Sequence, residues 1–183
     1  MAINKEIVIP ENPVSQFLFS NTSSAWLWLV IRLYVGYAWL TAGWGKVTAP
    51  AWTGENAGTA VQGFVQGALE NEEVTGWYAA FLENVVLSNA TVFSFMVAYG
   101  ELLVGLGLIL GLFTGIAAFF GGLMNVSFLF AGTLSTNPLL FVLATWLVLA
   151  WKVAGFYGLD RWALPFLGTP WQRKDSSVHS RSF

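Results

Sequence analysis

The chain has 183 residues, of which 56% are hydrophobic and only 10% are charged, and its mean hydropathy is +0.62. Soluble domains of this length rarely reach such values, so the composition predicts an integral membrane protein with one compact domain. The formal net charge of -2, without a cluster of Lys and Arg, argues against nucleic acid as a partner.

Cysteine is absent from the chain, and the single histidine, His179, lies close to its end. A chain without cysteine cannot form disulfides, thiolate nucleophiles, cysteine-held iron–sulfur clusters or c-type haem attachments. We therefore expect no metal or haem to be ligated by this chain. Redox chemistry, if there is any, must use a carrier of another kind.

Residues 1–24 are predicted to form an N-terminal tail without a secretory signal, since charges and two prolines interrupt its first twenty residues. Four apolar stretches follow, and each has roughly the 20 residues that cross a bilayer core of about 30 Å. They are Ala25–Gly45, Thr91–Phe113, Gly115–Thr133 and Pro138–Tyr157. Because the last two links are very short, their helices must be antiparallel neighbours. The pattern predicts an all-α fold, an integral membrane four-helix bundle, over residues 25–160.

The segment 47–90 between the first two spans is not a plain loop. Its stretches TAVQGFVQGALENEE and GWYAAFLENVVL place apolar residues at helical spacing. This spacing predicts two short amphipathic helices in the outer loop. The pattern leaves open whether they form a lid over a site or a packed surface element.

Basic residues predict the orientation in the cell membrane, because they are enriched on the cytoplasmic side. The outer segment offers Lys46 alone, together with several glutamates. The two tails hold Lys5, Arg161, Arg173, Lys174 and Arg181. We therefore expect a multi-pass protein with both termini cytoplasmic, including the C-terminal tail 161–183.

Each predicted span carries one strongly polar residue: Arg32, Glu101, Asn125 and Lys152. A charge at membrane depth costs several kcal/mol, so it is retained mainly where it is paired, hydrated or used. Residue counts put Arg32 about 10 Å and Glu101 about 18 Å above the cytoplasmic ends of their spans. We expect an Arg32–Glu101 ion pair whose hydrogen bonds Asn125 completes, with Lys152 nearby or reaching the interface. Such a pair is either a structural clamp or part of a functional site.

Aromatic residues also lie deep in the predicted spans. Tyr34, Tyr37, Trp39 and Tyr99 fall near the height of the polar residues or above it. They could wall a flat apolar ligand such as a quinone ring, although aromatic residues in spans more often serve packing.

Several motifs in fixed order resemble the DoxX/DoxD superfamily of small four-helix membrane proteins, and especially the DoxD-like small subunit of thiosulfate:quinone oxidoreductase. The similarity covers roughly residues 26–162. The matching elements are Arg32 with Gly36, AGWGK (Ala42–Lys46), GELLVGLGLILGLFT (Gly100–Thr114), GGLMN (Gly121–Asn125), AGTLSTNP (Ala131–Pro138) and GLDR (Gly158–Arg161).

The resemblance implies a membrane subunit of a quinone-linked oxidoreductase, which oxidises thiosulfate to tetrathionate at the outer face and passes the electrons to quinone. It implies a second membrane or DoxA-like protein subunit as partner, within the lipid bilayer. We expect Arg32, Glu101 and Lys46 to be the catalytic polar residues, and Trp39, Tyr99 and Asn125 to contact the quinone. The alternative is a non-catalytic accessory subunit of a respiratory or redox membrane complex. A small-solute carrier is less favoured, because no inverted repeat is apparent.

Overall fold

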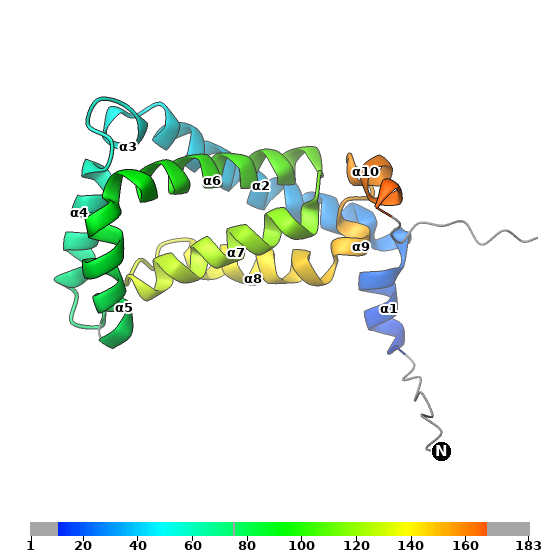
Figure 1. Cartoon of the computed structure of the whole chain (residues 1–183). Helices are drawn as coiled ribbons and strands as arrows, with labels where there is room; N and C mark the ends of the chain where they lie inside the picture. Colours follow the sequence, from blue (N-terminus) through cyan, green and yellow to red (C-terminus); the bar gives the residue numbers. More distant parts are fainter. Residues whose placement is uncertain (1–10, 75, 168–183) are drawn as a thin grey trace, which may run out of the picture.

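The computed structural model describes residues 11–74 and 76–167, and in this part of the chain all regular structure is helical (Figure 1). The elements, in chain order, are α1 (Pro13–Ser20), the 3-10 turn η1 (Thr22–Ser24), α2 (Ala25–Val47), α3 (Pro50–Thr53), α4 (Thr59–Leu69), α5 (Gly76–Phe81), the π-helical turn η2 (Leu82–Val86), the 3-10 turn η3 (Leu87–Asn89), α6 (Ala90–Leu110), α7 (Thr114–Phe130), α8 (Asn137–Leu149), α9 (Trp151–Ala154) and α10 (Asp160–Phe166). The predicted all-α fold class is confirmed.

Helices α2, α6, α7 and α8 form the body of the molecule (Figure 1). At one end, here called the capped end, lie α3, α4 and α5. The opposite end, here called the terminal end, holds α1, α9 and α10. Buried side chains of α2, α6, α7, α8 and α9 form one hydrophobic core. A second core joins α4, α5 and η2 to the start of α6 at the capped end.

Glycines let α2 and α6 pack with their backbones almost in contact. A Cβ added to Gly43 would strike the backbone of Leu102, and one added to Gly105 would strike the backbone of Leu40. Gly36 lies in the same way against Leu108. Small residues at a helix interface permit this approach. These three contacts fix the antiparallel register of the two helices.

The observed helices differ from the predicted spans at two places. Gly111 has a left-handed φ of 63°, which ends α6 at Leu110 instead of continuing it to Phe113. The stretch Pro138–Tyr157 is not one helix, because α8 ends at Leu149 and α9 begins at Trp151. No Gly or Pro stands at this break. Trp151, the first residue of α9, packs closely against Gly115 of α7.

Within the described residues, two helical stretches are long and apolar enough to cross a membrane, Thr22–Val47 and Gly76–Leu110. Helices α7 and α8 are apolar but shorter, with 17 and 13 residues. At about 1.5 Å per residue, α8 alone spans only about 20 Å. Four membrane spans therefore stay a prediction.

Both amphipathic stretches of the segment 47–90 contain helices, as predicted. The first forms α4, whose Val61, Val65 and Ala68 are buried in the second core. The second forms α5 and η2, and it continues through η3 into α6 instead of standing alone. Figure 1 shows α4 and α5 side by side across the capped end. Gly58, with φ 100°, begins α4 against the backbone of Thr91.

At the terminal end, Arg32 and Asp160 hold the turn between α6 and α7. The Arg32 guanidinium donates to the carbonyls of Leu108 (2.5 Å), Ile109 (3.2 Å) and Tyr157 (3.1 Å). The Asp160 carboxylate accepts from the backbone N–H groups of Phe113 (2.6 Å) and Thr114 (3.0 Å). Both side chains thus bond to backbone groups at helix ends, Arg32 to carbonyls in the last turn of α6 and Asp160 to N–H groups at the start of α7. We call this arrangement the Arg32–Asp160 clasp.

The register of α2 on α6 should depend on the missing side chain at Gly43. We expect Gly43→Ala to lower the free energy of unfolding by roughly 3 kcal/mol, because the added methyl group meets backbone atoms that cannot move independently. The measurement is the unfolding midpoint of the purified protein in mixed micelles. Gly45→Ala is the matched control, since no atom lies within 4 Å of a Cβ placed there. Equal stability of the two variants would contradict this role of Gly43.

Candidate functional site

A buried ion pair joins α2 to α6 near the capped end. Lys46 Nζ donates to Glu101 Oε2 at 2.6 Å, and the two side chains are 23% and 2% exposed. The Lys46 ammonium also lies 5.2 Å from the centre of the Trp52 ring of α3, close enough for a cation–π contact. One of three ammonium protons thus serves Glu101, so Lys46 retains donor capacity.

The predicted Arg32–Glu101 pair is wrong. The glycine contacts place Glu101 and Leu102 opposite Gly43, which lies eleven residues beyond Arg32. At 1.5 Å per residue this separates Arg32 from the level of Glu101 by about 16 Å, too far for an arginine side chain to bridge. Arg32 belongs to the clasp at the terminal end, and Lys46 takes its expected place beside Glu101. The counted depths failed because α2 extends past the end of α6 at the terminal end: Gly36 already faces Leu108, two residues before α6 ends, so the two span ends from which the depths were counted are not level.

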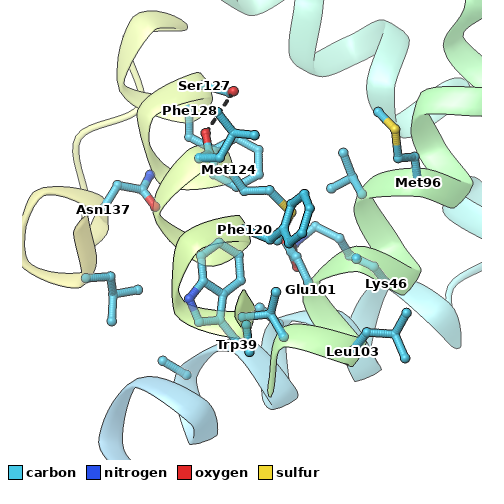
Figure 2. A pocket seen from close by; sticks show the side chains of 18 of the residues that line it. Trp39, Lys46, Met96, Glu101, Leu103, Phe120, Met124, Ser127, Phe128 and Asn137 are labelled. Atoms are coloured by element: carbon cyan, nitrogen blue, oxygen red, sulfur yellow. Dashed lines mark hydrogen bonds and ion pairs between the residues drawn. The ribbon is translucent and has the colours of Figure 1, made fainter. Parts of the chain in front are cut away.

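A cavity of about 1060 Å³ lies between α6 and α7, beside the ion pair. Trp39, Ala42 and Lys46 of α2 form part of its wall, and Phe64 of α4 and Tyr78 of α5 contribute at the capped end. Figure 2 shows Trp39, Phe120, Met124 and Phe128 around this space, with Lys46 and Glu101 facing each other at its side. The cavity therefore joins a largely aromatic and aliphatic wall to one charged pair.

The cavity continues as a groove along the outward faces of α6 and α7. Leu103 and Leu110 of α6 are 66% and 48% exposed, and Ile116 and Phe120 of α7 are 58% and 52% exposed, yet all four line it. Large apolar side chains exposed along a groove are typical of contact with lipid or an apolar ligand. Towards the terminal end α6 and α7 come closer, where Gly107 approaches Ala117, and the groove ends at the turn that joins the two helices.

Three residues were predicted to contact a cofactor, and the structure places only Trp39 on the cavity wall. Its Nε1 atom is buried and has no hydrogen-bond partner in the described part of the chain, so the ring carbons form the wall. Asn125 of α7 is fully buried behind the wall, and neither of its amide atoms has such a partner there. Tyr99 points away, is 45% exposed, and stacks on Phe95 with the ring centres 6.2 Å apart.

Sequence reasoning missed the α7 side of the site. Phe120, Met124 and Phe128 repeat every four residues and therefore share one face of α7, which lines the cavity. The Tyr78 hydroxyl donates to the carbonyl of Ser127 at 2.6 Å and so ties α5 to the same helix. The spacing was readable from the sequence, but an aromatic stripe with this period is equally typical of packing or of a lipid-facing surface.

Among the residues that the structure describes, no three His, Asp or Glu side chains gather where they could hold a metal ion.

The family model described as DoxX matches residues 27–134, more than half of the chain. The match contains α2 through α7, and with them Trp39, Lys46, Glu101 and the α7 side of the cavity. Searches of curated proteins and of solved structures find no match.

Lys46 and Glu101 should be strongly coupled in their contributions to the free energy of unfolding. We expect Lys46→Met to destabilise the protein by about 3 kcal/mol, because it leaves the Glu101 carboxylate buried without its partner. The double variant Lys46→Met with Glu101→Met should recover most of this loss, since both charges are then absent. Unfolding in mixed micelles measures all three variants, with Glu101→Met completing the cycle. If the two single losses simply add in the double variant, the side chains are not coupled.

Proposed function

This chain belongs to the DoxX family, whose model it matches over residues 27–134, and on that basis we propose that it is the quinone-binding membrane subunit of an oxidoreductase. The observation that carries the proposal is the apolar cavity that borders the Lys46–Glu101 pair and continues as a groove exposed along α6 and α7. A membrane quinone combines a flat ring bearing two carbonyl groups with a long apolar tail. The cavity offers a surface for each of these parts.

The ring requires donors and a group that handles protons. Lys46 uses one ammonium proton for Glu101, and we propose that another is donated to a quinone carbonyl. Reduction of a quinone to a quinol takes up two electrons and two protons. Glu101 is a carboxylate in this pair and holds no proton of its own, so we propose that it relays the two protons from water at the capped end, taking up one at a time and releasing it to a ring oxygen as the electrons arrive. The rings of Trp39 and Phe128, 6.5 Å apart, supply apolar faces on the same wall.

Thiosulfate is our proposed electron donor. Two thiosulfate anions give one tetrathionate and two electrons, which together with two protons reduce one quinone to quinol. Because Glu101 neutralises Lys46, the cavity is a poor site for a dianion, and we assign thiosulfate to the protein surface at the capped end or to a DoxA-like partner. Arg32 is occupied by three carbonyls, so we assign it to the fold.

We further propose that the four long helices cross the cell membrane with the capped end outside and both termini in the cytoplasm. Helices α1 and α10 lie together at the terminal end, as an even number of crossings requires (Figure 1). Single cysteines test this sharply, because the chain has none of its own. A cysteine at Gly63 should react with an impermeant maleimide in whole cells, and one at Ser20 should react only after lysis. The opposite pattern would invert the orientation.

Quinone binding should depend on free space beside Lys46. Ala42 is exposed within the cavity one turn before Lys46, so Ala42→Phe should weaken binding of a short-tailed benzoquinone by at least about tenfold, or about 1.4 kcal/mol. Binding is measured by equilibrium titration of the protein in lipid nanodiscs. Ala80→Phe is the matched control, because Ala80 is exposed on α5 and does not line the cavity.

The same preparations test the electron donor. Native membranes that contain the chain and its partners should form quinol and tetrathionate in equal amounts when thiosulfate is added, and Ala42→Phe should slow both. Quinone binding without thiosulfate oxidation would leave a quinone-binding accessory subunit. If the wild-type protein binds no quinone, or if both phenylalanine variants bind like the wild type, the proposed function is rejected.

A further inference from the structure

The cavity is long and has two unlike ends. Towards the capped end it contains the Lys46–Glu101 pair, and the side chains of Ser127, Thr133 and Asn137 also line it there. Towards the terminal end, its wall consists of Leu110, Phe113, Ile116 and other apolar residues. Polar groups therefore gather at one end of an otherwise apolar space.

The length of the apolar part follows from the helices that form it. Glu101 and Leu110 are nine residues apart on α6, which corresponds to about 14 Å along the axis. An extended hydrocarbon chain advances about 1.25 Å per carbon, so about eleven carbons cover this distance. Beyond Leu110 the chain turns into α7, so the groove between the two helices ends at this turn, which the Arg32–Asp160 clasp holds.

We propose that the site binds its ligand in one direction, with the polar ring at Lys46–Glu101 and the hydrocarbon tail running between α6 and α7 towards the terminal end. This inference rests on the proposed function and adds the orientation of the quinone. Carbons beyond about the eleventh leave the groove sideways, past the exposed side chains of Leu106, Leu110 and Ile116, into the surrounding lipid.

The position of the Lys46–Glu101 pair makes the reverse orientation of the quinone unfavourable. A ring at the terminal end would meet only apolar side chains, and its two carbonyls would lose their hydrogen bonds. A tail at the capped end would cover the partly exposed Lys46 ammonium with hydrocarbon and remove its remaining contact with water. The directed placement avoids both costs.

Photo-crosslinking measures the direction. The probes are benzoquinones with a saturated tail that carries a diazirine either at the second or at the eleventh carbon, bound to the full-length protein in nanodiscs. After illumination, peptide mapping should find the near label on residues around Ala42 and Leu103, and the far label around Leu110 and Ile116. The reverse assignment of the two labels, or far labels on α4 and α5, would overturn the inference.

A variant pair sharpens the result. Leu110→Trp should fill the closed end of the groove and reduce far labelling there by at least about tenfold, because tail and indole compete for one space. Leu149→Trp is the control, since Leu149 of α8 is 56% exposed and lies outside the groove. Circular dichroism checks that both variants fold. Equal far labelling in both variants contradicts the placement of the tail.

Competition separates this inference from the proposed function. Excess unlabelled quinone should abolish both labels in the wild-type protein, while excess phosphatidylcholine should not. If phospholipid displaces the probes and quinone does not, the groove binds lipid and the proposed function fails. If quinone displaces them but the two labels map to the same residues, quinone binding stands and the directed placement is rejected.

Discussion

The close packing of α2 against α6 is the constraint on which the rest of the structure depends. Gly36, Gly43 and Gly105 remove the side chains that would hold the two backbones apart, and their spacing allows only one register. This register brings Lys46 to Glu101 at one level and Arg32 to the last carbonyls of α6 at another. One helix contact thus positions both buried basic groups, although they serve different ends of the molecule.

The two basic groups illustrate how a charge is retained in an apolar chain. The Arg32 guanidinium is planar, with several donors in a fixed geometry, and it donates to backbone carbonyls at the end of α6 and in the turn after α9. Lys46 is a point charge on a flexible stem, it faces a carboxylate, and it borders open space. The guanidinium therefore has the contacts of a structural group. The ammonium keeps donor capacity at the place where a ligand could use it.

The fold class and most helices could be predicted from the sequence, because long apolar stretches and glycine turns are local signals. The helix α2 was predicted to within two residues of its end, and the amphipathic spacing correctly indicated α4 and α5. The partner of Glu101 could not be predicted in the same way, since it depends on how far α2 extends past the end of α6 at the terminal end. That offset is a property of packing between helices, and counts of residues within each span do not contain it. The cavity wall on α7 was missed for a related reason, because Phe120, Met124 and Phe128 have the same pattern whether they face a core, lipid or a ligand.

The groove along α6 and α7 determines which ligand concentration sets the occupancy of the site. In the proposed membrane placement, a ligand that enters past Leu103 and Ile116 comes from the hydrocarbon phase, so occupancy follows its mole fraction among the lipids and not its vanishing concentration in water. Transfer of a tail from lipid to a leucine-lined groove gains little hydrophobic free energy, because both surroundings are equally apolar. Selectivity among membrane components must then arise from the few polar atoms of Lys46 and Glu101. If the ligand is the proposed quinone, such a site can bind it weakly and still respond to the ratio of quinone to quinol in the surrounding membrane.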